Sequence, residues 1–330
     1  ADMVEYWHYH SIHNSAETYW KGVLSHDFSE NHVYQEACTI GADFKRLNEH
    51  LIHLKKENRV AMMISNDALT ALNVFERTGG NVHYNDVVNA VYRALYELNI
   101  ECDFVYEDEK NLKKYEAVVV PALYAAPEET LKNLLHFTEQ GGLLIGTFKT
   151  AFADENVKVY PDTQPHLLRE AFGIRYNQFS VAENLPLSDE AHSCFSGFYE
   201  WVEPVRAEKV LSYDHYDSKQ YAAVTRSTFG QGKTLYLACM PPKELLKKLL
   251  KEAFSEVGIY GNAGSEGFPV IVKKGINQLG KKINYIYNYS SEEASALCPG
   301  DSVELLSGKE IKKGEPILLN RWGFVILEEK

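Results

Sequence analysis

Apolar residues recur at spacings of three and four between residues 33 and 54, and this period predicts a long amphipathic helix. An apolar stripe of that kind is stable only when another layer of structure covers it. Residues 1–57 supply little cover, because the aromatic run at 3–9 predicts only one short strand and a polar loop follows. We therefore expect a sheet from outside residues 1–57 to cover the stripe, which consists of Val33, Ala37, Ile40, Phe44, Leu47, Leu51 and Leu54.

Strands of buried type alternate with amphipathic helices from residue 59 onwards. Helices are predicted over 84–100 and 126–142, the second of which opens at Pro127 and closes at a pair of glycines. Strands that alternate with helices imply a parallel sheet with helices on both faces. The strands are predicted at 59–65, 102–106, 115–123 and 143–148.

The pattern is irregular after Ile174 and becomes regular again near residue 210. A strand is predicted at 210–213, and a hairpin over 221–239 turns at its Gly-Gln-Gly sequence. A leucine-rich helix over 241–258 closes this region. We expect its apolar face to pack on a core and not on a membrane surface, because the chain is acidic.

The last part of the chain follows a glycine-rich linker at 261–269. Its short strands and turn signals predict a small antiparallel β-sandwich. The sequence is therefore divided into three domains, which span residues 1–57, 58–260 and 261–330.

Composition excludes several classes of protein. The 330 residues carry a formal charge of −12, which argues against nucleic acid as a partner. No apolar run has the length of a membrane span. The five cysteines are scattered and form no CxxC pair, so we expect reduced thiols, no metal knuckle and a cytoplasmic location. Ala1 follows neither an initiator Met nor a signal pattern, and we expect a longer protein to extend upstream of it.

Three histidines, a glutamate and four aromatic residues gather in the opening segment 7–20, whose sequence is WHYHSIHNSAETYW. His8 and His10 share one face of the predicted strand, and His13 and Glu17 follow. This set resembles the ligands of a metal ion, although no second-shell partner accompanies it. A metal-dependent hydrolase built on His8, His10 and His13 is one open interpretation.

A sugar-binding pocket is another interpretation of the same segment. Carboxylates and imidazoles bind sugar hydroxyls, while aromatic rings cover the apolar faces of the sugar. The segment also lies between a predicted strand and a long helix, where a (β/α)₈ barrel places its active-site loops. An ordinary buried aromatic cluster stays open as well, with His8 at its rim. The residues concerned are Trp7, His10, His13, Glu17, Tyr19 and Trp20.

Residues 7–27 resemble the last strand and loop of the catalytic barrel in glycoside hydrolase family 42, the β-galactosidases. The specific part is AETYWKGVLSHDF. Residues 59–260 resemble the trimerisation domain of that family, an α/β fold of the flavodoxin-like, class I glutamine amidotransferase type, and the final β module resembles its C-terminal domain. The resemblance implies a homotrimer, a galactoside substrate and no cofactor.

The resemblance also implies roles for individual residues. Glu17 falls at a carboxylate that binds galactose hydroxyls, and Trp7 at an aromatic wall of the same subsite. Trp20 lies where many members carry a contacting His. Both catalytic carboxylates of the family come from earlier strands of the barrel, so we expect this chain alone to be inactive.

Residues 59–260 lack the signature of an amidotransferase site. Such a site needs a Cys on a tight turn after a strand, and neither candidate turn contains one. Cys239 follows a strand but precedes two prolines, and we expect a buried structural thiol there. A non-catalytic assembly module is therefore the main alternative to a galactosidase fragment.

Overall fold

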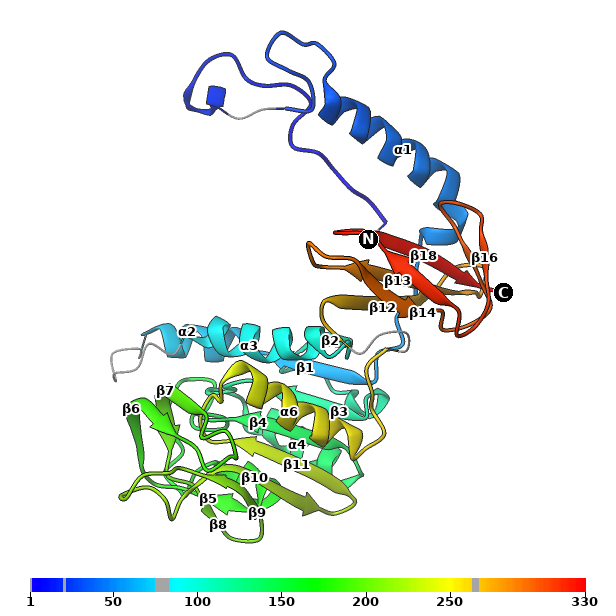
Figure 1. Ribbon diagram of the computed structural model, residues 1–330. Coiled ribbons are helices and arrows are strands. Elements are labelled where there is room, and N and C mark those ends of the chain that lie inside the picture. Colours follow the sequence, from blue (N-terminus) through cyan, green and yellow to red (C-terminus); the bar gives the residue numbers. More distant parts are fainter. Residues whose placement is uncertain (1, 20–21, 75–82, 263–266) are drawn as a thin grey trace. The chain divides into compact units, whose positions relative to one another are not determined.

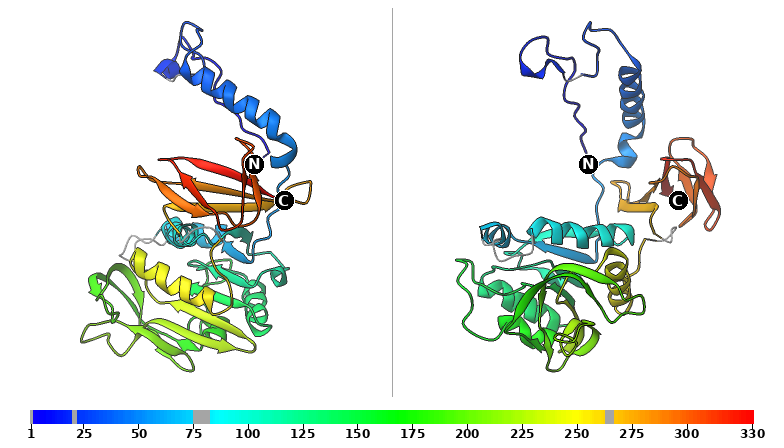
Figure 2. Two further views of the ribbon diagram at one scale, coloured as in Figure 1. Left: turned by 45° about the vertical axis from the view of Figure 1, so that its right-hand side comes forward. Right: turned by 60° about the vertical axis from the view of Figure 1, so that its left-hand side comes forward.

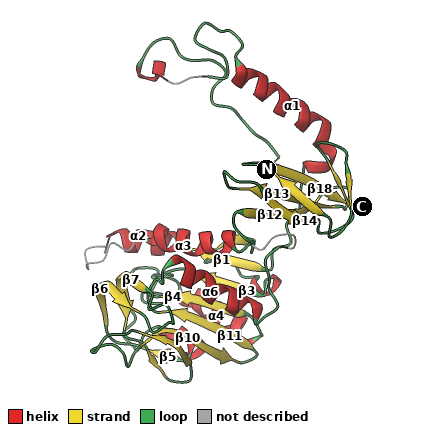
Figure 3. Cartoon of the chain, in the orientation of Figure 1, coloured by secondary structure: helices red, strands yellow, loops and turns green. Residues whose placement is uncertain are grey.

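The computed structural model describes residues 2–19, 22–74, 83–262 and 267–330 (Figure 1). The chain divides into two compact units. One unit is formed by residues 58–261, and the other combines residues 1–57 with 262–330. Helices and strands of both units are distinguished in Figure 3.

The unit of residues 58–261 is built on a seven-stranded sheet with the order β2-β1-β3-β4-β11-β10-β9. Strands β2, β1, β3, β4 and β11 run parallel, and β10 and β9 continue the sheet in antiparallel fashion. The predicted parallel sheet is thus confirmed. Its strands are β1 Val60–Ile64, β2 Cys102–Tyr106, β3 Ala117–Val120, β4 Leu143–Thr147, β9 Glu208–Ser212, β10 Ala222–Phe229 and β11 Gly232–Leu237.

Helices cover both faces of this sheet (Figure 2). Val60 and Met62 of β1 lie in the same hydrophobic cluster as residues of α3 and α6, whereas Ala61 and Met63 pack with residues of α4. Because both faces are buried, the strands form continuous apolar runs in the sequence. The helices are α2 Asn66–Val74, α3 Tyr84–Glu97, α4 Glu128–Glu139, α5 Arg169–Phe172 and α6 Lys243–Ser255, with 3₁₀ turns η2 Leu112–Lys114 and η3 His166–Leu168.

The stretch after Ile174, which the sequence left irregular, contains four strands. Two of them, β6 Phe179–Pro186 and β7 Cys194–Glu200, form a separate antiparallel hairpin. Its register shifts between Ala182 and Leu185, and Asn184 has a φ of 53°. This bulge interrupts the alternation by which a strand is recognised in a sequence. The two shorter strands, β5 Ile174–Arg175 and β8 Glu203–Pro204, pair with each other.

The β module of residues 267–330 consists of two antiparallel sheets with a common core. One sheet has the order β12-β13-β18-β15-β16, and the other pairs β14 with β17. Val272, Ile286 and Leu327 of the first sheet share a hydrophobic cluster with Ile317 and Leu319 of the second. The strands are β12 Val270–Ile276, β13 Lys282–Asn288, β14 Ala294–Leu297, β15 Ser302–Glu304, β16 Glu310–Ile311, β17 Pro316–Leu319 and β18 Phe324–Glu329.

Helix α1, His32–Leu51, confirms the helix predicted from the apolar stripe. The Asn31 side chain caps it by accepting hydrogen bonds from the backbone N–H groups of Val33 and Tyr34. Its last turns pack on the β module, where Leu47 lies in a cluster with Ile283, Leu305 and Ile326.

Polar contacts reinforce this packing of α1 on the β module. His50 Nδ1 lies 2.6 Å from Glu328 Oε2 on β18, and Arg46 donates to the Leu305 carbonyl at 3.0 Å. The earlier part of the stripe is open, since Val33, Ile40 and Phe44 are 43%, 44% and 50% exposed. The β module therefore covers only one end of the stripe.

The strand predicted at residues 3–9 is not formed in this structure. Residues 2–9 are described without any regular secondary structure. A strand needs a neighbour for its backbone hydrogen bonds, and the described residues offer none beside this segment.

Within the described ranges, no helix combines the length and the apolar character of a bilayer-spanning segment.

Candidate functional site

The segment 7–28 folds back on itself through backbone hydrogen bonds. Val23 N–H donates to the His8 carbonyl at 2.9 Å, and Leu24 N–H donates to the Tyr9 carbonyl at 2.8 Å. Gly22 passes so close to His10 that a Cβ at Gly22 would lie 2.5 Å from the His10 Cα. Only glycine allows the two arms of this loop to approach so closely.

Phe28 joins two of the histidines that the sequence singled out. Its ring centroid lies 4.9 Å from that of His10 and 5.1 Å from that of His13. His13 also stacks on His26 at 6.0 Å. Sequence reasoning did not assign Phe28 and His26 to the site, although both belong to the motif AETYWKGVLSHDF that suggested it.

The remaining candidate residues are placed separately. Trp7 stacks on His8 with ring centroids 5.7 Å apart, and its side chain is 87% exposed. Glu17 lies on the short 3₁₀ turn η1, Ala16–Tyr19, where it is exposed and receives no hydrogen bond or ion pair from the described residues. Trp20 lies outside the described residues. The structure therefore brings His10 and His13 together but leaves Glu17 and Trp7 apart from them.

The described histidines and the glutamate of this segment do not gather into a metal-binding group. Within the described ranges, no three His, Cys, Asp or Glu side chains gather closely enough to hold a metal ion. The metal interpretation of His8, His10 and His13 has no geometric support there. Exposed imidazoles, a carboxylate and aromatic faces can bind hydroxyls and apolar sugar faces.

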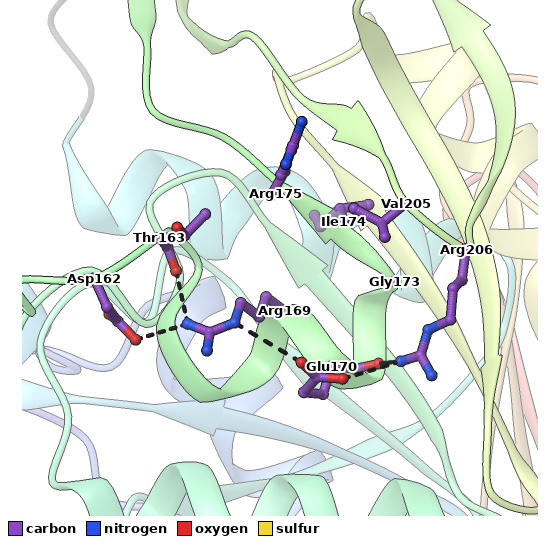
Figure 4. Close-up of a pocket in the computed structure, with 9 residues that line it drawn as sticks. All are labelled: Asp162, Thr163, Arg169, Glu170, Gly173, Ile174, Arg175, Val205 and Arg206. Atoms are coloured by element: carbon purple, nitrogen blue, oxygen red, sulfur yellow. Dashed lines mark hydrogen bonds and ion pairs between the residues drawn. The ribbon is translucent and has the colours of Figure 1, made fainter.

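A surface hollow of about 390 Å³ in the unit of residues 58–261 is shown in Figure 4. Arg169 pairs with Asp162 at 2.7 Å, Arg206 with Glu170 at 3.4 Å, and Arg175 with Glu203 at 2.8 Å. Each guanidinium in the hollow is thus matched by a carboxylate of the same chain. This arrangement offers neither an uncompensated cation nor a free pair of carboxylates for catalysis.

A buried polar centre lies at the carboxyl ends of β4 and β11 in the same unit. Glu200 is fully buried and accepts hydrogen bonds from the Lys149 backbone N–H at 2.6 Å and the Tyr236 hydroxyl at 2.7 Å. Burial raises the pKa of Glu200 to about 7.

The thiol nearest to this centre has no features of a nucleophile. Cys239 is fully buried, and its burial raises the pKa of the thiol. A reactive cysteine needs exposure and a lowered pKa. The hydrogen bonds of this centre therefore stabilise the fold and do not form an amidotransferase site. Cys239 is the buried structural thiol that the sequence predicted.

Comparison with known proteins identifies relatives for the whole chain. Residues 58–260 match the family model described as the β-galactosidase trimerisation domain. The β-galactosidase BgaB of Geobacillus sp. (strain Y412MC61) is 28% identical over 265 residues, which cover 78% of this chain and 38% of the relative. The β-galactosidase LacZ of Heyndrickxia coagulans is 24% identical over 320 residues, which cover 94% of this chain and 47% of the relative.

Solved structures extend the similarity to the fold. The β-galactosidase of Bacillus circulans sp. alkalophilus superimposes with a TM-score of 0.91 at 23% identity, over 98% of this chain and 49% of that one. The β-galactosidase of the haloarchaeon Halorubrum lacusprofundi gives a TM-score of 0.82 at 22% identity, over 98% and 47% of the two chains. The chain thus spans less than half the length of these relatives.

Proposed function

The chain belongs to the family of the β-galactosidase trimerisation domain, and from this premise we propose that it is the C-terminal portion of a retaining β-galactosidase of glycoside hydrolase family 42. The enzyme would hydrolyse terminal β-D-galactosyl residues. The match of residues 58–260 to the family model carries this proposal, and the β-galactosidase relatives that align over most of the chain support it.

The open part of helix α1 supports the proposal independently. Val33, Ile40 and Phe44 form an exposed apolar stripe beyond the turns that pack on the β module. A helix on the outside of a (β/α)₈ barrel buries such a stripe against the strands of the barrel. Residues 1–57 would thus be the last strand, loop and helix of a catalytic barrel.

In the complete enzyme, the segment 7–20 would form one wall of the galactose subsite. Glu17 would accept hydrogen bonds from sugar hydroxyls, and Trp7 would present its exposed ring to an apolar face of the sugar. His10 and His13, both supported by Phe28, would bind further hydroxyls. Trp20 would complete the wall at the position where relatives often carry His.

Catalysis with retention requires two carboxylates about 5–5.5 Å apart, one as nucleophile and one as acid/base. Glu17 has no carboxylate partner among the described residues. We assign Glu17 to binding and place both catalytic carboxylates in parts of the enzyme outside this chain. The chain alone would therefore be inactive.

The coding sequence upstream of Ala1 gives the first test. An open frame that encodes further βα units, with an Asn-Glu pair after one strand and a Glu after a later one, would support a barrel. The complete protein should then hydrolyse a β-galactoside with retention, which proton NMR of the first-formed anomer reports. A start codon directly before Ala1, or inversion at the anomeric carbon, would contradict the proposal.

The second candidate is a non-catalytic module that assembles a homotrimer, and the description of the matched family favours it. The two candidates differ in what the complete protein does. A trimer in light scattering without hydrolysis of any galactoside would leave assembly as the only function. Hydrolysis by the complete protein would exclude a purely structural role.

A further inference from the structure

One side of the β module carries a group of aromatic side chains that helix α1 leaves partly uncovered. Tyr285 and Tyr287 are alternate residues of β13, and Phe324 of β18 lies opposite Tyr287. Ring centroids lie 6.3 Å apart for Tyr285 and Tyr287, and 5.9 Å apart for Tyr287 and Phe324. Tyr289 adds a ring at 5.9 Å from that of Tyr287. We call these four residues the tyrosine face.

The tyrosine face continues the surface on which α1 packs. Ile283 and Tyr285 are alternate residues of β13, so their side chains point to the same side of the sheet. Leu47 of α1 covers this side at Ile283, and Tyr285 borders that cluster. Farther along the same side, Tyr289 and Phe324 are 41% and 48% exposed. The covered and the uncovered parts therefore belong to one continuous surface.

The open part of the α1 stripe starts at the same contact. Phe44 and Ile40 lie about one and two helical turns before Leu47, on the same side of the helix. They are 50% and 44% exposed. Figure 1 shows that α1 leaves the β module at an angle. The open stripe and the tyrosine face are thus two adjoining apolar surfaces that meet where Leu47 packs.

The first residue that the structure describes, Asp2, lies at the end of α1 that packs on the β module. Its carboxylate accepts a hydrogen bond from the His53 N–H at 2.7 Å. Two residues farther on, Lys55 exchanges two backbone hydrogen bonds with Ile276 of β12. Residues that precede Asp2 in the complete protein would therefore enter beside the β module.

The candidate sugar-binding segment 7–28 lies at the other end of α1. Asn31, which caps the start of the helix, donates a hydrogen bond to the Ser25 hydroxyl at 2.8 Å. The 20 residues of α1 separate the two ends by about 30 Å. In a (β/α)₈ barrel the active site lies at the carboxyl ends of the strands, whereas the amino ends serve stability. The β module is thus on the side of the amino ends.

We propose that the tyrosine face binds the amino-terminal end of the catalytic barrel, which would be formed by residues that precede Ala1 in the complete protein. This inference rests on the function proposed above. Apolar side chains that gather on a surface indicate contact with a further layer of protein. The barrel would cover the tyrosine face and the open stripe of α1 together. The β module would then stabilise the barrel from the end opposite to the sugar site.

Hydroxyl-radical labelling read by mass spectrometry tests the contact directly, with the complete protein compared with the chain of residues 1–330. Tyr289 and Phe324 should be oxidised about fivefold more slowly in the complete protein, because side chains that are 41% and 48% exposed would become buried. Tyr216 and Leu318 are the controls, since they are 81% and 67% exposed and lie outside the tyrosine face. Their oxidation rates should be the same in both proteins.

The comparison also identifies the occupant of the tyrosine face. Both proteins contain the unit 58–261, so any association through that unit protects residues equally in the two. Rapid oxidation of Tyr289 and Phe324 in both proteins would mean that nothing covers the face. Slow oxidation in both would mean that a second copy of the chain covers it. Either result would overturn the inference.

A variant of the complete protein adds a functional readout. Phe324→Asp should lower the Tm by about 5 °C or more, because it places a charge in the contact with the barrel. Its kcat/KM for a β-galactoside, measured well below the Tm, should equal that of the wild type, since the contact is far from the sugar site. Leu318→Asp on β17 is the matched control and should keep the wild-type Tm.

An unchanged Tm in Phe324→Asp, or a loss of kcat/KM in the folded variant, would contradict the contact. The labelling experiment needs no substitution and decides the question if Phe324→Asp does not fold. A complete protein that hydrolyses a β-galactoside but leaves the tyrosine face exposed would contradict only this inference. A coding sequence that starts directly before Ala1 would contradict both this inference and the proposed enzyme.

Discussion

Two glutamates, Glu200 and Glu17, have opposite surroundings, because one is buried and the other is exposed. Glu200 is completely buried and accepts hydrogen bonds from the Lys149 N–H and the Tyr236 hydroxyl, whereas Glu17 is exposed on a short 3₁₀ turn and has no partner among the residues that the structure describes. Burial disfavours the ionised form of a carboxyl, while an exposed carboxyl is accessible to a ligand that donates hydrogen bonds. Burial therefore separates a structural carboxyl from a candidate binding group.

Replacement of Glu200 by Gln should flatten the dependence of stability on pH. The pKa of Glu200 is raised from 4.5 to about 7, so its contribution to stability is fully present below pH 4.5 and is lost as the pH rises through 7. The wild-type protein should lose up to about 3 kcal/mol of unfolding free energy through this group across that range. Urea unfolding at a series of pH values measures the difference.

The exposed Glu155 provides a matched control for that experiment. Glu155→Gln should keep the wild-type slope of stability against pH. An unchanged slope in Glu200→Gln would mean that Glu200 titrates at its ordinary pKa despite its burial.

Replacement of Glu17 by Gln in the complete enzyme should lower kcat/KM for a β-galactoside. A hydrogen bond to a charged group contributes about 1.5–3 kcal/mol, which corresponds to a loss of about tenfold to over a hundredfold. Steady-state kinetics checks this, with Glu36→Gln on the exposed face of α1 as the control. Wild-type kinetics in the Glu17 variant would remove this residue from the galactose subsite.

At the scale of elements, helix α1 carries an apolar stripe that its neighbour in the structure covers only in part. The β module covers the stripe around Leu47, and the positions Val33, Ile40 and Phe44 stay open. The regular spacing of three and four made the helix predictable, because that period depends only on local geometry. Which sheet covers which turn depends on residues more than 200 positions away, such as Ile283.

Leu47→Ala and Phe44→Ala form a pair of variants that tests this division. In the chain of residues 1–330, Leu47→Ala should destabilise the unit that contains α1 by about 2–4 kcal/mol, because it leaves a cavity against the β module. Phe44→Ala should change stability by less than about 0.5 kcal/mol, since Phe44 is half exposed. Denaturant unfolding followed by circular dichroism compares the two.

The same two variants, measured in the complete protein, test whether a barrel packs on helix α1. In the complete protein, where a barrel would cover the open turns, Phe44→Ala should cost about 3 kcal/mol or more. An equally small effect of Phe44→Ala in both proteins would argue that no barrel packs on this helix.

At the scale of the whole molecule, the chain combines a sheet-based unit with a unit assembled from its two ends. One unit is the continuous stretch of residues 58–261. The other unit combines residues 1–57 with residues 262–330, which lie before and after that stretch in the sequence. These relatives are more than twice as long as the chain. The family model that matches residues 58–260 is described as a trimerisation domain. We therefore expect the stability of the complete protein to depend on association.

The melting temperature of the complete protein should rise with its concentration. An oligomer gains stability by mass action, and a roughly hundredfold increase in concentration should raise the Tm of a trimer by about 1–3 °C. Calorimetry at two concentrations measures the shift. A wild-type melting temperature that does not depend on concentration would contradict a dissociating trimer.

The sequence by itself determined the elements whose period is local and the order in which they follow one another. Helix α1, the buried strands of the parallel sheet and the hairpin β10–β11 were all predictable, because repeats of two or about 3.6 residues reflect backbone geometry alone. The candidate residues Trp7, His10, His13 and Glu17 were likewise found from residue type and from resemblance to a family.

Only the tertiary structure decided what depends on contacts between distant residues. It left residues 3–9 without a strand, because a strand needs a neighbour to satisfy its backbone groups. It brought Phe28 between His10 and His13, and it placed the bulged hairpin β6–β7 where the alternation of residues gave no signal. Pairing, burial and the surroundings of a side chain are set by the packing of the folded chain, which no local period encodes.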